Sequence, residues 1–224
     1  MASTEAPPTR RIYTPAEVAV HNGKEDCWII VHRKVINMTD VLKGDHGILA
    51  DPILDAAGSD VSHWFDAKTG DVKYHIDPET QLNIPYTPQG RFIHVPPRDP
   101  TTAWSIDGDL PWWKDPKLVM GHVTAKVRRI RIVNTLTHQE HVVEVGCEES
   151  IEEISSRYLA WNAHAGSYTW KALLDGHFRS MDMACTLEEN GVPDDDLEME
   201  GLLLDPDLFL PTLHLYYNDD LTSA

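Results

Sequence analysis

Histidine is the side chain with which this protein could most readily do chemistry, because imidazole binds metal ions and exchanges protons near neutral pH. The sequence contains 12 histidines. His138 and His141 lie in a predicted turn, without the further ligands nearby that a zinc site needs. The three cysteines form no CxxC pair, which indicates neither a zinc site nor a disulfide framework. The motifs of serine hydrolases and of nucleotide-binding enzymes are also missing, so we expect a protein that is not an enzyme.

The charge balance makes two classes of partner improbable. The chain has 224 residues and a net charge of −17, so nucleic-acid phosphates and anionic membrane surfaces should repel it. No apolar run is long enough to span a bilayer, and the first residues lack the apolar core of a secretory signal. Unpaired cysteines suit a reducing compartment. We therefore expect a cytoplasmic protein without a nucleic-acid or membrane partner.

The elements that would position these histidines begin with an α+β pattern between Tyr13 and Phe65. Thr14 and Glu17 form a capping box for a first helix, with Pro15 at its first position. Short strands are predicted at residues 28–31 and 34–37. Further short helices are expected to begin at Thr39, Pro52 and Asp60.

Three stretches of this region resemble the cytochrome b5 family: YTPAEVAVHN, CWIIVHRKVINMTDVLKGDHGIL and AAGSDVSHWF. In that family a heme b iron lies between two histidines from two helix–loop–helix pairs. An iron held by two imidazoles is closed to oxygen and suits electron transfer. The resemblance implies that His46 is the first ligand. The second ligand follows five residues after the phenylalanine that matches Phe65, which places it at Gly70, and glycine cannot bind iron.

Three other side chains are candidates for the second ligand. His75 lies five residues beyond Gly70 and is the leading candidate, so the predicted heme ligands are His46 and His75. His63 lies on a helix that should pack into the core. Tyr74 is a weaker candidate, since some domains of this kind bind heme through tyrosine. If none of them binds iron, the fold serves only as a scaffold.

The second half of the chain predicts another α+β domain. Isoleucine alternates with arginine at residues 129–132, which indicates a half-buried strand, and a turn then leads to a return strand at 141–145. Ser150 and Glu153 form a capping box for a helix. A strand at 168–174, a helical turn at 186–190, an acidic loop at 193–201 and a strand at 213–217 follow.

This order of elements resembles the β-grasp fold of ubiquitin-like proteins. Conjugation in that family requires a Gly-Gly carboxyl terminus, whereas this sequence ends Thr-Ser-Ala. The resemblance therefore implies a built-in interaction module.

A segment rich in proline and tryptophan lies between the two patterns. Eight of the 15 prolines fall between Pro78 and Pro116, together with Trp104, Trp112 and Trp113. Exposed indoles are costly in water, so we expect the segment to pack on a domain or on a partner. Residues 91–95, RFIHV, predict its one strand. The expected organisation is a mobile tail (1–11), a cytochrome b5-like domain (12–97), a Pro/Trp-rich connecting segment (98–122) and a β-grasp domain (123–218).

The order of the two domains around this segment is similar to that of a family of cytochrome b5-domain proteins of motile cilia. The resemblance implies an axonemal protein that associates with radial spokes and other axonemal proteins. It would help to regulate ciliary or flagellar beating, with heme as a redox sensor. Two alternatives stay open: a soluble b5-type electron carrier that uses His46 and His75, and an adaptor of the ubiquitin system.

Overall fold

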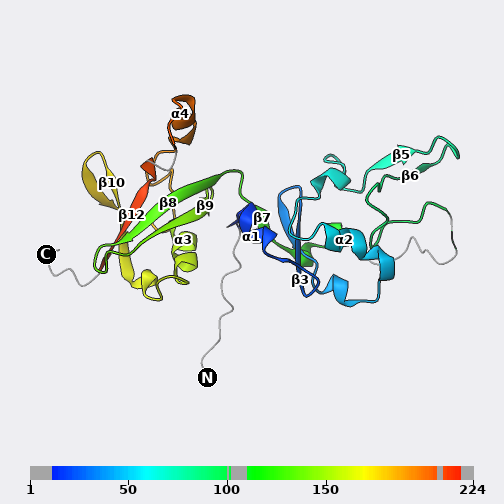
Figure 1. The fold of residues 1–224 in the computed structure, drawn as a ribbon, viewed down its shortest axis with the longest axis horizontal. Helices are drawn as coiled ribbons and strands as arrows, with labels where there is room; N and C mark the ends of the chain where they lie inside the picture. The colour runs from blue at the N-terminus through cyan, green and yellow to red at the C-terminus, as the bar shows by residue number, and fades with distance from the viewer. Residues whose placement is uncertain (1–11, 100, 102–109, 206–208, 218–224) are drawn as a thin grey trace, which may run out of the picture. The chain divides into compact units, whose positions relative to one another are not determined.

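The structure, a computed structural model, describes residues 12–99, 101, 110–205 and 209–217. The chain divides into two compact units, one ending at Val123 and the other beginning at Thr124. Both units combine short helices with a five-stranded sheet (Figure 1). The expected mobile tail and Trp104 lie outside the described residues.

A five-stranded sheet forms the base of the first unit. Its strands are Ile12–Tyr13 (β1), Asn22–Gly23 (β2), Asp26–Val31 (β3), Lys34–Asn37 (β4) and Val119–Val123 (β7). They lie in the order β1-β7-β4-β3-β2, with β1 and β7 parallel and the other neighbours antiparallel. Side chains alternate across β3: Cys27 and Ile29 face the main core, whereas Ile30 joins a smaller cluster.

The helices of the first unit are short. They are Pro15–Ala19 (α1) and Asp51–Asp55 (α2), with 3-10 turns at Val41–Lys43, Gly47–Leu49 and Ser62–Trp64. The capping box at the start of α1 is confirmed, because Thr14 accepts a hydrogen bond from the Glu17 N–H and Glu17 accepts one from the Thr14 N–H. The helices expected after Thr39 and Asp60 are single 3-10 turns.

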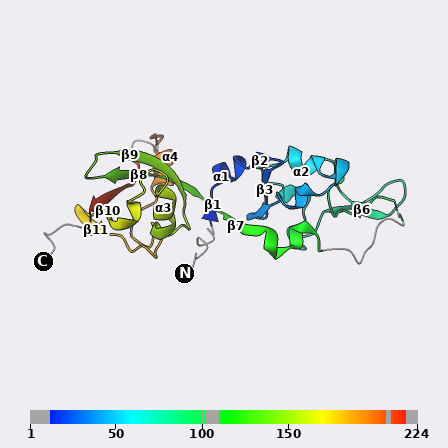
Figure 2. The ribbon, with the colours of Figure 1, turned by 90° about the horizontal axis from the view of Figure 1, so that it is seen from below.

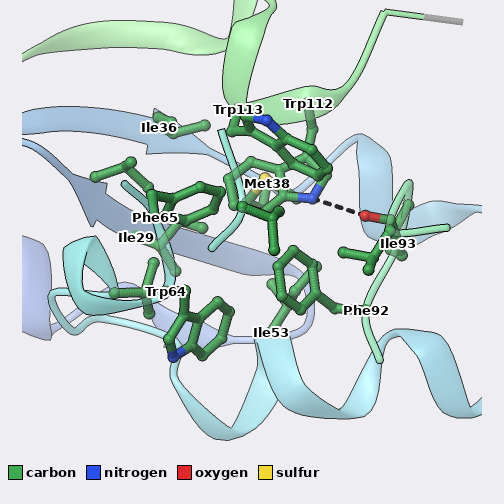
Figure 3. Close-up of a cluster of buried hydrophobic side chains, with 14 of the residues drawn as sticks. Ile29, Ile36, Met38, Ile53, Trp64, Phe65, Phe92, Ile93, Trp112 and Trp113 are labelled. Atoms are coloured by element: carbon green, nitrogen blue, oxygen red, sulfur yellow. Dashed lines mark hydrogen bonds between the residues drawn. The ribbon is translucent and has the colours of Figure 1, made fainter. Parts of the chain in front are cut away.

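The segment expected to connect the domains at residues 98–122 packs on a domain, which is one of the two outcomes expected for it, and its described part up to residue 122 belongs to the first unit. Trp112 and Trp113 are buried in the main core with Phe65 and Phe92 (Figure 3). The Trp112 indole N–H donates to the Ile93 carbonyl at 3.1 Å. Burial of two indoles and the pairing of β7 with β4 explain why this segment does not act as a free linker.

The strand expected at residues 91–95 is wrong. This stretch forms a turn, in which His94 has a left-handed φ of 67°. The turn lets Phe92, Ile93 and Val95 all enter the core, which a strand with alternating faces would not allow. A separate two-stranded hairpin precedes it, formed by Tyr74–Ile76 (β5) and Asn83–Pro85 (β6).

The second unit contains a mixed sheet with one face covered by a helix. Its strands are Val127–Asn134 (β8), Glu140–Gly146 (β9), Tyr168–Leu174 (β10), His177–Ser180 (β11) and Thr212–Tyr217 (β12). Their order is β11-β10-β12-β8-β9, with β12 parallel to β8 and the other pairs antiparallel. Helix Ile151–Tyr158 (α3) buries its apolar side against the sheet (Figure 2). The predicted hairpin, helix and strands of this half are confirmed.

The acidic loop expected at residues 193–201 is also partly wrong, because Asp196–Gly201 forms a helix (α4). Acidic residues in its first turn oppose the positive end of the helix dipole, which favours helix formation. Leu202 N–H donates back to the carbonyls of Glu198 and Met199, which closes the last turn.

Candidate functional site

His46 occupies a loop between two 3-10 turns of the first unit. Its ring is partly buried, and Nε2 lies 2.8 Å from the backbone carbonyl of Val41. A carbonyl only accepts hydrogen bonds, so Nε2 carries the proton and its lone pair is not free for a metal. Gly44 permits this arrangement, because a Cβ there would lie 2.5 Å from Nε2.

Gly70 ends a tight turn that contains no helix. Its φ is +67°, and its N–H donates to the Asp66 carbonyl at 2.8 Å. The N–H groups of Thr69 and Lys68 donate to the Asp66 carboxylate, which holds the pKa of Asp66 below its ordinary value. A turn with a left-handed residue favours glycine. The described residues here form a turn at 62–64, this loop and the β5–β6 hairpin, not a second pair of helices.

The other predicted ligands lie apart from His46. His75 is exposed on β5, and its ring packs edge-on against Tyr86 with centroids 5.3 Å apart. Tyr74 and His75 help to line one open groove of about 680 Å³, and His46 is not part of that groove. His63 is also exposed and touches the Trp64 ring.

The aromatic core lies directly beside the position expected for the second ligand. Asp71, the neighbour of Gly70, accepts hydrogen bonds from the Trp113 indole at 3.0 Å and from Lys114 Nζ at 2.5 Å. Partial burial acts to raise the pKa of Asp71, but these bonds outweigh it and lower that pKa. Both Trp112 and Trp113 have ring centroids 5.7 Å from that of Phe65 (Figure 3). The tryptophans of the stretch PWWKD predicted a buried segment, but nothing in the sequence predicted its hydrogen bonds to Asp71.

The described residues therefore do not fit a heme held by two histidines. One imidazole, that of His46, is at the family position, and its Nε2 binds a carbonyl. The second position is Gly70, and His75 is exposed on a hairpin. The described residues also hold no group of three or more His, Cys, Asp or Glu side chains that could bind a metal ion.

Comparison with known proteins identifies the family. The model of the "Cytochrome b5-like Heme/Steroid binding domain" matches residues 14–79. Cytochrome b5 domain-containing protein 1 of Xenopus laevis is 50% identical over 218 residues, which cover 97% of this chain and 99% of the relative. The chain belongs to the cytochrome b5 domain-containing protein 1 family. The human member is 49% identical over 214 residues, covering 95% of this chain and 92% of its own.

Membership of the cytochrome b5 domain-containing protein 1 family extends through both units, since these alignments run over nearly the whole chain. Similarity to cytochrome b5 itself is confined to part of this chain. The cytochrome b5 of Oryza sativa subsp. japonica is 34% identical over 98 residues, covering 41% of this chain and 68% of that protein. In the described ranges no helix has the length and apolar character needed to cross a membrane.

Proposed function

We propose that this protein is a non-catalytic subunit of the ciliary or flagellar axoneme that binds radial-spoke and other axonemal proteins and helps to regulate beating. The first unit is a protein-binding scaffold and not an electron carrier. One observation supports this assignment above the others: the second iron-ligand position is Gly70, in a tight turn, and His75 is exposed on the hairpin.

The proposal treats the second unit as a ubiquitin-like β-grasp domain that supplies binding surface. Its sheet order supports this, because the first and last strands, β8 and β12, pair in parallel at the centre while hairpins flank them. Helix α3 follows the first hairpin and covers one face. The axonemal location is inferred from the resemblance of the whole chain to proteins of motile cilia.

A soluble b5-type heme electron carrier is the second candidate. The match of residues 14–79 to the heme or steroid binding domain and the position of His46 favour it. In that function the His46 ring would have to break its hydrogen bond to the Val41 carbonyl. A second ligand would also have to come from a residue that this structure does not place beside His46.

Co-sedimentation with demembranated axonemes tests the proposed function. Axonemes from cells that lack the endogenous protein would be mixed with the purified chain, and spoke contacts would be mapped by chemical cross-linking. We expect saturable binding that is unchanged in a His46→Ala/His75→Ala double variant, because neither imidazole is needed by a scaffold. An unrelated acidic protein of the same size is the control. Absence of saturable binding, or its loss in the double variant, would contradict the proposal.

A further inference from the structure

The segment that follows α4 exposes an unusual run of apolar side chains. Leu202, Leu203 and Leu204 are 63%, 94% and 42% exposed, and Phe209 is 62% exposed. Single exposed leucines are normal on a protein surface, whereas contiguous exposed apolar side chains indicate a contact surface. The acidic residues at 193–201 predict a solvated loop, so this apolar run was not expected.

The backbone of the most exposed of these side chains is part of the cap that ends α4. Leu203 has a φ of +56°, in the left-handed region. The Leu203 N–H donates to the Glu200 carbonyl and the Leu204 N–H donates to the Met199 carbonyl, which is the hydrogen-bond pattern of a helix C-cap with a left-handed residue. The positive φ of Leu203 therefore belongs to the end of α4, and the cap fixes the backbone from which this exposed side chain projects.

These leucines border a groove on the second unit. The groove has a volume of about 730 Å³ and is lined by residues of the α4 segment and of strands β8 and β9. Its apolar lining comes from Val127, Leu203, Leu204 and Leu210. Its charged lining comes from Arg129, Glu144, Asp196, Glu200 and Asp205. The groove thus combines an apolar surface with four carboxylates and one guanidinium.

The negative charge of the groove is only partly balanced from within. Lys126 Nζ lies 3.3 Å from the Asp196 carboxylate but is closer to Asp194, at 2.6 Å. Arg129 lies directly across the β8–β9 pair from Glu144 and balances part of its charge, and no ion pair among the described residues includes the Glu144 or Glu200 side chain. With four carboxylates and one guanidinium in its lining, the groove would still attract a cationic side chain from another molecule.

We propose that this groove binds a segment of a partner protein in which arginine or lysine side chains flank apolar ones. Leucines 203 and 204 would pack against the apolar side chains of that segment, and Glu144 and Glu200 would pair with its cations. Nucleic acid and anionic lipid are excluded as ligands by the negative charge. The inference deepens the proposed function, on which it rests for the existence of a protein partner.

A defined peptide tests the chemistry of the groove without requiring the natural partner. The probe is a fluorescein-labelled helical peptide of about 20 residues, long enough to hold a helix, with leucines on one face and arginines beside them. A matched peptide carries glutamate in place of arginine. Binding to the full chain is measured by fluorescence anisotropy, and the contact region is mapped by backbone hydrogen exchange.

Two variants and two controls locate the binding. Leu203→Asp and the double variant Glu144→Gln/Glu200→Gln change exposed groove residues, so folding should be unaffected. Leu136→Asp, at a leucine that is 64% exposed in the β8–β9 turn, and Glu152→Gln on α3 are the controls. We expect Leu203→Asp to raise the Kd for the arginine peptide about tenfold or more, and the double Gln variant to raise it about fivefold. The two control variants should change this Kd less than about twofold. Binding of the arginine peptide should also weaken as the salt concentration is raised, because salt screens the attraction between opposite charges.

Several results would overturn the inference. The inference would be wrong if the glutamate peptide bound as tightly as the arginine peptide, or if neither peptide bound. It would also be wrong if Leu203→Asp and Leu136→Asp weakened binding equally, or if the peptide protected backbone amides outside the groove from exchange. If size-exclusion chromatography shows a dimer that Leu203→Asp dissociates, the occupant is a second copy. If removal of residues 1–11 strengthens peptide binding, the occupant is the chain's own Arg10–Arg11 segment.

The two proposals can fail separately. Saturable binding to axonemes together with no peptide binding would support the proposed function and contradict the groove as a binding site. Peptide binding at the groove together with no binding to axonemes would support the groove as a binding site and contradict the axonemal function.

Discussion

At the scale of single residues, Trp112 is central to the first unit. It is 1% exposed, and it binds Ile93 through its indole and His94 through its backbone N–H. Trp112→Ala should lower the free energy of unfolding of that unit by about 3–5 kcal/mol, through lost burial and a cavity. Urea unfolding followed by circular dichroism measures this. Trp161→Ala, at a side chain that is 51% exposed, is the matched control, and an equal effect of both changes would contradict the assigned core.

Glu148 makes the second unit sensitive to acid. Partial burial acts to raise its pKa, but hydrogen bonds from the Thr124 hydroxyl and the Ala125 N–H outweigh this and lower the pKa from 4.5 to about 2. Because the folded pKa lies below the unfolded value, the stabilisation is complete above about pH 4.5 and is lost as the pH falls towards 2. Glu148→Gln should lower stability at pH 7 and flatten its fall across that window. Thermal unfolding at several pH values would show this, and parallel curves for the two proteins would contradict it.

At the scale of elements, helix α3 depends on its N-terminal capping box. Ser150 accepts a hydrogen bond from the Glu153 N–H at 3.2 Å, and Glu153 accepts one from the Ser150 N–H at 2.9 Å. Ser150→Ala should therefore reduce stability by about 1 kcal/mol, whereas Ser156→Ala on the exposed side of the same helix should cost less than about 0.5 kcal/mol. Chemical denaturation compares the two. A larger loss at Ser156 would show that the cap is not important.

The elements with local signals were predictable from the sequence. Capping boxes at Thr14 and Ser150, and the alternation in β8, depend on residues a few positions apart, and the structure has all three. The hairpin β5–β6 and helix α4 were missed because their patterns are weak and short. Strand β7 was missed because it is defined by its pairing with β4, far away in the sequence.

The candidate site was predictable to a similar extent. Counting along the sequence located His46 and the missing ligand at Gly70. It did not reveal that His75 is exposed on a hairpin, or that Asp71 holds Trp113 and Lys114. The Asp71 contacts join residues about 40 positions apart, and no local pattern encodes them. The position of His75 depends on the β5–β6 pairing, whose pattern is too short to predict.

At the scale of the whole molecule, the first unit includes residues well beyond the 14–79 family match. Trp112, Trp113 and strand β7 complete its core and its sheet. A chain truncated after residue 97 should therefore fail to fold, whereas one truncated after residue 123 should unfold cooperatively. Circular dichroism and amide hydrogen exchange on the two chains check this. Equal cooperative folding of both would contradict the assignment of residues 110–123 to the first unit.

The most direct measurement is the absorption spectrum of the full chain titrated with hemin, oxidised and reduced, beside His46→Ala and His75→Ala variants. Two imidazole ligands give sharp, split, low-spin visible bands. Because Gly70 takes the second position and His75 is exposed on its hairpin, we predict no such bands and no difference between the wild type and His75→Ala. A sharp low-spin spectrum that His75→Ala abolishes would contradict the scaffold assignment and would establish a two-histidine heme protein.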